Sequence, residues 1–489
     1  MTISSLMLLC LIIPAAGAVF IVLSHRLADL REGVTLFSAA ALFAVVCQLF
    51  RRPDVFDAPA TTLATPLPGL ELSLQLEPLG LLFAGIASLL WMITSLYTIG
   101  YMRGNQEQHQ TTLYACFALA LTSTMGIALS GNLLTLFVFY EMLTLSTYPL
   151  VTHKRDHDAV AGGRYYLGIL VGSSIGLLLP AIIWTWHLAG TTTFHYGGLF
   201  TSAPPKAVVS ILFLLYAFGI GKAALMPLHR WLPEAMVAPT PVSALLHAVA
   251  VVKAGVFCVV KVILYVFGPA LLQGCSGLVI VQVVAGFTLL CASLIALRQD
   301  NLKRRLAYST ISQLSYISLS AAILAPLSIR GAVVHIAAHA VGKITLFFAA
   351  GAIYTAAHKT RVSELDGIGQ RMPWTMTAFA IATLSMIGLP PTAGFLSKWF
   401  MLQGAFEANN LLVIAVLLLS TLLNASYFVP IVYAAFFKPE RHISDHPHGE
   451  APLSMVIALS ATALLTIILF FWPDLVISIA TRLSIGGVS

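Results

Sequence analysis

The chain has 489 residues, of which 58% are hydrophobic and 9% are charged, against roughly 25% charged residues in an ordinary soluble domain. Since one membrane-spanning helix needs about 20 apolar residues, this composition excludes a soluble protein and leaves no room for a separate water-soluble domain. The net charge of +7 indicates that cytoplasmic loops carry an excess of Lys and Arg. Long continuous apolar runs favour helices over a membrane barrel, so we predict an all-α polytopic membrane protein.

Apolar runs separated by polar, Pro or Gly residues predict about fourteen transmembrane helices. The first is read as a retained helix because it has no basic flank and no convincing cleavage site. The longest connection, 51–77, contains an alternating stretch from Leu70 to Leu76 that fits a small hairpin or strand. The expected spans are 3–23, 32–50, 78–100, 111–130, 133–152, 162–189, 206–226, 240–266, 273–297, 302–324, 328–356, 373–407, 411–437 and 452–472.

Positive charge is unevenly divided between the loops on the two sides of this arrangement. We count sixteen Lys and Arg residues in or beside the odd-numbered loops and four in or beside the even-numbered loops. By the positive-inside rule, the odd-numbered loops face the cytoplasm. With fourteen helices, both termini then lie on the non-cytoplasmic side of the membrane, which we expect to be a bacterial or archaeal cell membrane.

Prolines interrupt two of the predicted spans. The seventh meets Pro227 and Pro233 after Lys222, and the twelfth meets Pro390 and Pro391, where a helix should break. Broken helices at corresponding places in two halves indicate inverted repeats around a polar cavity, here helices 4–8 and 9–13. The expected division is 1–110 for the first three helices, 111–266 and 273–437 for the two repeats, and 438–489 for the last loop and helix.

Ionisable residues within the predicted spans are the candidate functional residues, because a charge in the middle of a bilayer is costly and tends to face the interior of the bundle. Lys261 is instead expected to extend its ammonium to the membrane surface, and for Lys253 both readings stay open. Glu141 is too short to reach the surface, and Lys222 lies beside a helix break. The candidates are Glu141, Lys222, His247, Lys253, His335, His339, Lys343 and Lys398.

His335, His339 and Lys343 recur at positions i, i+4 and i+8, which places them on one helix face over about 12 Å. Histidine exchanges protons near neutral pH, so this track suits stepwise proton transfer through water. Metal binding by the two histidines is the weaker alternative, because no carboxylate lies nearby in the sequence. His247 and Lys253 are six residues apart, about 240° around a regular helix, and should not share one narrow face.

Other polar segments give weaker signals. The run 441–448 contains three histidines and resembles a metal-binding tract, although a solvated loop is the simpler interpretation. The span 302–324 is rich in hydroxyls, which fits either hydrogen bonding between helices or a hydrated wall. The six cysteines show no CxxC and no His/Cys pairing at metal spacing, so neither a disulfide framework nor a metal or cofactor site is expected.

Long ordered motifs in the predicted helices resemble the antiporter-like subunits found in respiratory complex I, membrane-bound hydrogenases and Mrp-type cation/proton antiporters. The resemblance covers roughly residues 75–435. The motifs lie at 139–142, 221–222, 227–236, 238–247, 306–314 and 388–398.

The resemblance implies fourteen helices, inverted five-helix repeats and a hydrated axis of charged residues halfway across the membrane. It makes Glu141 and Lys222 a carboxylate–lysine pair, His247 and Lys253 relay groups of helix 8, and Lys343 the central lysine of helix 11. His335 and His339 then precede Lys343 as relay histidines, and Lys398 is the terminal group, where some members of the family carry glutamate. The end of the chain soon after helix 14 favours a shorter type, similar to the D component of Mrp antiporters or its hydrogenase relatives.

We therefore predict a proton-translocating subunit of a larger membrane complex, with other membrane subunits as partners and any redox chemistry or sodium or potassium movement in those partners. The sequence shows no catalytic site of its own and leaves open whether the complex is a redox-driven pump or an antiporter. Two alternatives stay open: a self-sufficient solute or cation/proton transporter, which broken helices also allow, and a structural subunit whose charges only hold helices together.

Overall fold

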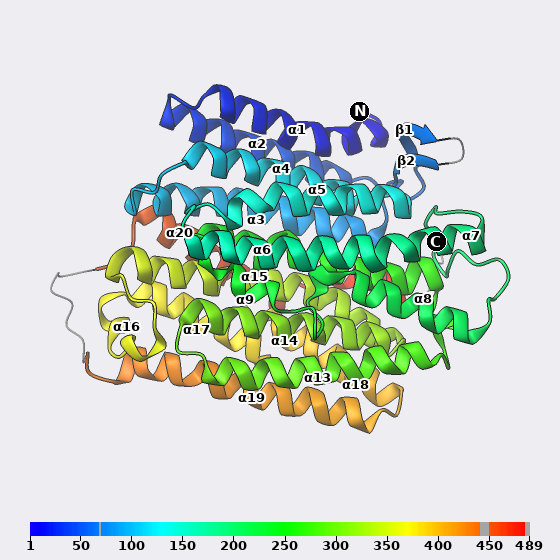
Figure 1. Cartoon of the computed structure of the whole chain (residues 1–489). Helices are drawn as coiled ribbons and strands as arrows, with labels where there is room; N and C mark the ends of the chain where they lie inside the picture. The colour runs from blue at the N-terminus through cyan, green and yellow to red at the C-terminus, as the bar shows by residue number, and fades with distance from the viewer. Residues whose placement is uncertain (68–69, 441–448, 485–489) are drawn as a thin grey trace.

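The computed structural model describes residues 1–489 except 68–69, 441–448 and 485–489. The described chain is a bundle of helices that run roughly side by side, with one small hairpin at one end (Figure 1). We call this end the hairpin end, and the opposite end, which carries α16 (Ile368–Arg371), the α16 end. The predicted all-α membrane fold is confirmed.

The N-terminal part consists of five long helices and the hairpin. Its elements are α1 (Ile3–Leu23), α2 (Ala28–Phe50), β1 (Thr61–Leu67), β2 (Leu70–Leu74), α3 (Pro78–Gly104), α4 (Gln110–Ala128) and α5 (Leu133–Val151). The strands β1 and β2 pair antiparallel, with Thr61 opposite Leu74. The alternating stretch within 51–77 thus forms the strand pair that it predicts.

The middle of the chain is broken into short segments. These are α6 (His157–Ser173), η1 (Ser174–Leu178), α7 (Leu179–Ala189), α8 (Lys206–Gly219), η2 (Gly221–Ala223), α9 (Trp231–Glu234), η3 (Ala235–Val237), α10 (Thr240–Ala244), η4 (Leu245–Val249), α11 (Val251–Lys261), η5 (Val262–Phe267) and α12 (Pro269–Leu272). The segments η1, η4 and η5 are π-helical, a wide turn that is frequent at functional sites.

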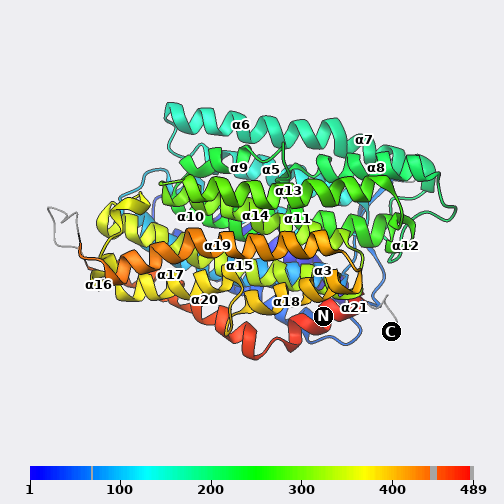
Figure 2. The ribbon, with the colours of Figure 1, turned by 90° about the horizontal axis from the view of Figure 1, so that it is seen from below.

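The remaining helices complete the bundle, and Figure 2 shows α6 and α7 along one edge and α20 and α21 along the opposite edge. They are α13 (Ser276–Arg298), α14 (Leu302–Ala322), α15 (Pro326–Ala357), η6 (Val362–Glu364), α16, α17 (Pro373–Ile387), α18 (Ala393–Glu407), α19 (Leu411–Phe437), α20 (Leu453–Phe471) and α21 (Asp474–Ser484). The helix α21, which follows Pro473, is not among the predicted spans and is too short to span a membrane.

Eleven helical segments within the described residues are long and apolar enough to cross a membrane. The spans predicted at 206–226 and 373–407 are not among them because each is broken into shorter pieces. The span predicted at 302–324 forms α14, which is long enough but carries many hydroxyl, amide and basic side chains. The number fourteen and the inverted repeats stay predictions.

Both predicted helix breaks occur in the structure. The helix α8 ends at Gly219, ahead of Pro227, and α17 ends at Ile387, ahead of Pro390 and Pro391. At the first break, the indole nitrogen Nε1 of Trp231 donates to the carbonyl oxygen of Gly221 at 3.0 Å. Since a helix end leaves carbonyl groups without helical partners, this bond stabilises the break.

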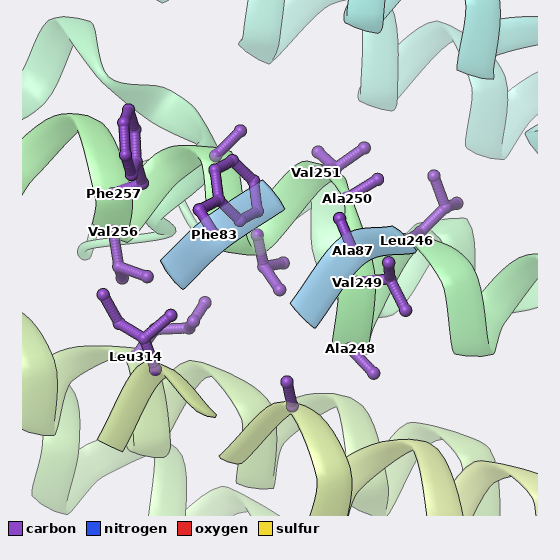
Figure 3. Close-up of a cluster of buried hydrophobic side chains, with 14 of the residues drawn as sticks. Phe83, Ala87, Leu246, Ala248, Val249, Ala250, Val251, Val256, Phe257 and Leu314 are labelled. Carbon is purple, nitrogen blue, oxygen red and sulfur yellow. The ribbon is translucent and has the colours of Figure 1, made fainter. Parts of the chain in front are cut away.

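One part of the apolar core lies between α3, η4, α11 and α14. Phe83 of α3 packs against Phe257 of α11 with ring centroids 5.0 Å apart, and Val256 lies near Leu314 of α14 (Figure 3). Every residue from Thr240 to Phe267 is buried, and so is most of α15. These two segments therefore hold their polar side chains away from lipid.

Candidate functional site

The eight candidate residues lie on six elements of the bundle, and most of them are fully buried. Glu141 lies on α5, Lys222 on η2, His247 and Lys253 on η4 and α11, the next three on α15, and Lys398 on α18. Six of the eight have no exposed surface, while Glu141 and Lys398 are partly buried. Burial of six lysines and histidines in an apolar bundle is costly unless polar partners surround them.

Lys222 is held by the helix that carries Glu141. Its Nζ donates to the carbonyl oxygen of Tyr140 at 2.9 Å and to the hydroxyl of Thr144 at 2.6 Å. The ammonium also lies over the Tyr140 ring, 3.2 Å from the centroid, a favourable position for a cation. Glu141 interacts electrostatically with Lys222, but these two described residues form no ion pair within 4 Å, so the structure shows the predicted pair separated.

The position of Lys222 depends on a close approach of α11 to the break in the chain. A Cβ added at Gly255 would lie 2.3 Å from the carbonyl carbon of Lys222 and 2.6 Å from its carbonyl oxygen. Only glycine allows two backbones to come this close. The helix that carries Lys253 is therefore packed directly on the turn that carries Lys222.

The two halves of the candidate axis meet at Lys253 and His339. The Lys253 Nζ contacts the His339 Nδ1 at hydrogen-bond distance, which settles that Lys253 points into the bundle. His339 also stacks on His335, with ring centroids 6.0 Å apart, as the i, i+4 spacing predicts. His339 therefore connects a lysine of α11 with the histidine track of α15.

His247 also approaches this centre. It packs between Trp231 and Phe347, with ring centroids 6.4 and 5.4 Å away, and it interacts electrostatically with His339. On a regular helix His247 and Lys253 would lie on different faces, but η4 is a π-helix, so the turn between them is wider than α-helical. Both residues consequently lie within electrostatic range of His339.

One face of α14 serves the second half of the axis. Ser309 accepts a hydrogen bond from the Lys343 Nζ at 2.8 Å, and the Gln313 Oε1 lies 2.9 Å from the His335 Nε2. The Tyr316 ring lies 4.5 Å from the Lys398 Nζ. These three α14 residues follow the spacing i, i+4 and i+7, so the hydroxyl-rich helix forms a polar wall along the axis.

Further polar partners, which are not among the predicted site residues, complete the surroundings of His335 and Lys343. The His335 Nδ1 lies 2.8 Å from the Ser397 hydroxyl on α18. The Tyr427 hydroxyl donates to Ser309 at 3.0 Å, next to Lys343, and also contacts Asn424. Tyr427 and Asn424 are three residues apart on α19, a helical spacing that would have predicted a shared face.

Lys398 closes the break between α17 and α18. Its Nζ donates to the carbonyl oxygens of Met386 and Ile387 at 2.8 and 3.0 Å. These carbonyls belong to the last turn of α17, where a cation is favoured. Lys398 also lines a small cavity of about 150 Å³ together with Tyr316 and Phe395, so it lies where the axis approaches the outer surface of the bundle.

Several buried polar atoms along the axis have no protein partner. Among the residues that the structure describes, they include the Glu141 Oε1, both ring nitrogens of His247, the His339 Nε2 and the Asn424 Nδ2. Buried polar atoms are almost always satisfied by protein groups or by ordered water. These atoms are therefore candidate positions for ordered water beside the candidate residues.

Lys261 differs from its prediction. It is fully buried rather than extended to the surface, and its Nζ lies 3.1 Å from the Glu77 Oε2. The reason is that the Glu77 carboxylate lies inside the bundle and pairs with the ammonium, which therefore does not have to reach water. Glu77 directly precedes Pro78, so the sequence alone indicates a loop residue before a helix and not a buried partner of Lys261.

Metal-binding patterns are absent from the described part of the chain, which holds no group of three or more His, Cys, Asp or Glu side chains arranged for a metal ion. The histidine-rich run 441–448 lies outside the described residues. All six cysteines are free thiols.

Comparisons with known proteins agree on one family. The sequence profile described as "NADH:quinone oxidoreductase/Mrp antiporter, TM" matches residues 130–424, more than half of the chain. The NADH-quinone oxidoreductase subunit N of Desulforudis audaxviator is 33% identical over 417 residues, which cover 81% of this chain and 80% of that protein.

Two solved structures share the fold along almost the whole chain. A chain of the Mrp complex from Dietzia sp. superimposes with a TM-score of 0.86 at 20% identity, covering 99% of this chain and 97% of its own length. A chain of the archaeal membrane-bound sulfane sulfur reductase gives a TM-score of 0.85 at 23% identity, covering 99% and 98%. With its profile match, its sequence relative and this shared fold, the chain belongs to the NADH:quinone oxidoreductase/Mrp antiporter family of membrane proteins.

Proposed function

We propose that this chain is an antiporter-like subunit that moves protons along the axis from Glu141 and Lys222 to Lys398. The observation that carries the proposal is the buried contact between Lys253 and His339, which joins the titrating groups of the two halves. On either side of it, lysines, histidines and unpartnered buried polar atoms follow one another across the bundle. A packing role would favour apolar side chains at these positions, since buried charges seldom add stability.

The mechanism that we propose uses the separation of Glu141 and Lys222. An opposite charge nearby favours the protonated form of a lysine, and its withdrawal favours release of the proton. In the structure, Lys222 is bound by Tyr140 and Thr144, while the Glu141 Oε1 has no protein hydrogen-bond partner. Movement of Glu141 toward Lys222 would load the lysine, and movement away would pass its proton on to Lys253 and His339.

The transported ion that we propose is the proton. A dehydrated alkali cation needs several oxygen ligands, whereas the axis offers lysine and histidine, with Glu141 as its one candidate carboxylate among the described residues. Positive side chains repel a bare cation and can carry a proton instead. Sodium or potassium movement would then take place in a partner subunit or at an interface with one.

Replacing Glu141 by Gln, Lys222 by Ala or Lys343 by Ala is expected to abolish most proton transport, because each change deletes a proton site. All three variants should still assemble, since a neutral side chain replaces a costly buried charge. The measurement is proton uptake into vesicles that contain the assembled complex from native membranes. Near-normal uptake by all three variants, or binding of sodium or potassium at Lys343, would show that the proposal is wrong.

The partners that we propose are other membrane subunits. The relatives named above include a subunit of an NADH-quinone oxidoreductase and a chain of an Mrp complex. Large apolar side chains on α13 and α19, such as Phe287 and Leu422, are exposed, so either lipid or neighbouring subunits cover them. Copurification of intact complexes would identify the partners.

The orientation that we propose places the hairpin end outside the cytoplasm and the Arg298–Arg305 segment inside it. Met1 and the end of α21 lie near this hairpin end, since Arg52 donates to the Met1 carbonyl and Tyr196 to the Leu483 carbonyl. In a chain without native cysteines, an impermeant thiol reagent should label Thr2→Cys in intact cells. It should label Arg304→Cys only after permeabilisation, and the reverse pattern would invert the direction of transport.

A further inference from the structure

A second buried ionisable pair lies at the hairpin end, outside the axis described above. Lys261 is the last residue of α11, and Glu77 directly precedes α3. The Lys261 Nζ lies 3.1 Å from the Glu77 Oε2, and the two side chains are 0% and 9% exposed. The pair therefore sits just beneath the surface of the bundle.

The surroundings of Lys261 suit an ammonium ion. Its Nζ donates to the carbonyl oxygen of Ser130 at 2.8 Å. The aromatic rings of Phe194, Phe257 and Tyr265 lie 4.1, 5.5 and 5.8 Å from the same nitrogen, within the range of cation–π attraction. The ammonium is thus held in place by one carboxylate, one carbonyl and an aromatic cage.

The pair is covered by three chain segments that come from distant parts of the sequence. The backbone N–H of Gly131 donates to the Ser73 carbonyl at 2.9 Å, which ties β2 to the turn between α4 and α5. The Phe194 N–H donates to the Gly131 carbonyl at 3.0 Å. These three segments therefore include the Ser130 carbonyl and the Phe194 ring, which both contact Lys261. A change at Lys261 would consequently act directly on the segments that cover the pair.

Lys261 is connected to the axis along α11. It follows Lys253 by eight residues on the same helix, a rise of about 12 Å. Cys258 lies between them on the same helix and is fully buried. The pair thus lies between the axis and the hairpin end of the molecule.

We propose that Glu77 and Lys261 form a gate that exchanges protons between the axis and the side of the membrane that the hairpin faces. A proton arriving from the axis is released by breaking an N–H bond of the Lys261 ammonium and forming an O–H bond on Glu77, which leaves a neutral amine beside a neutral carboxyl group. Glu77, the more exposed partner, then gives the proton to water at the hairpin end. This gate rests on the proposed function, because without proton transport along the axis it has nothing to release.

A purely structural ion pair is the alternative, and arginine separates the two roles. Arginine keeps its positive charge at all accessible pH values, so Lys261→Arg retains the ion pair but cannot release a proton. We expect the assembled Lys261→Arg complex in vesicles to take up protons at least about tenfold more slowly than the wild type, equivalent to about 1.4 kcal/mol in the barrier. The matched control is Lys206→Arg, since Lys206 is an exposed lysine at the start of α8 and should leave uptake unchanged.

The neutral double variant Glu77→Gln with Lys261→Met also separates the gate from a structural pair, and it avoids the larger arginine side chain at position 261. A structural pair replaced by two neutral groups leaves no unpaired buried charge, so uptake would return to the wild-type rate if the pair were only structural. The gate predicts an assembled but slow complex. Wild-type uptake by either variant overturns the gate. Lys343→Ala, measured in the same vesicles, separates the two proposals, since wild-type uptake there would overturn the proposed function as well.

Discussion

Replacement of Lys253 by Met is expected to lower proton uptake by about 100-fold while the protein still assembles. Lys253 contacts His339, and these two residues join the groups of α11 to those of α15. Proton transfer to or from a positioned side chain typically contributes about 100-fold or more to a rate, so loss of this side chain should slow uptake by about two powers of ten. The measurement is proton uptake by vesicles with equal amounts of assembled complex.

A double-mutant cycle with His339→Ala shows whether the two residues act as one connection. If the proton passes between them, the second replacement should add little to the first, because residues in contact are not additive. Lys154→Met is the matched control, since Lys154 is exposed in the connection between α5 and α6 and its loss should not slow uptake. Independent, additive losses at Lys253 and His339 would contradict a shared step.

Gly394→Ala is expected to be strongly destabilising. A Cβ at Gly394 would lie 1.8 Å from the backbone carbonyl oxygen of Ser385, and backbone cannot move aside as a side chain does. Overpacking of a tight core typically costs about 1–3 kcal/mol. We expect α18 to be pushed away from α17, which lengthens the bonds from Ser397 to His335 and from Lys398 to the α17 carbonyls, and transport to fall with stability.

Gly168→Ala provides the control for this substitution. Gly168 lies on α6, and a Cβ there meets no atom within 4 Å, so alanine should be neutral or stabilising through its higher helix propensity. Thermal unfolding of the detergent-solubilised complex and proton uptake measure the two variants side by side. Equal midpoints for Gly394→Ala and the wild type would contradict the close contact between α17 and α18.

Patterns within one helix were predictable from the sequence. His335, His339 and Lys343 share a face because their spacing matches the helical repeat, and the prolines after Lys222 and Ile387 mark the two breaks. The same reasoning applies to Ser309, Gln313 and Tyr316 on α14, whose i, i+4 and i+7 spacing carries the signal of a common face.

Contacts between distant segments were not predictable in this way. Glu77 and Lys261 meet because the start of α3 and the end of α11 reach the same end of the bundle, and no local spacing encodes that meeting. For the same reason, the sequence could not show that Lys222 is bound by Tyr140 and Thr144 rather than by Glu141. The π-helical turn at η4 was also hidden, because apolar residues fill it as they would fill an α-helix.

The polar composition of α14 has a consequence for how the protein enters the bilayer. The helix α14 carries three basic residues in its first turn, followed by a run of hydroxyl groups and one amide, and polar side chains within a span make its insertion into lipid less favourable. Such a segment cannot partition into lipid alone. Only three residues separate α14 from the end of the apolar α13, and α14 is buried in the finished bundle. During biosynthesis, we therefore expect α14 to leave the translocon together with α13 as a helical hairpin, with its polar face shielded until α15 is added.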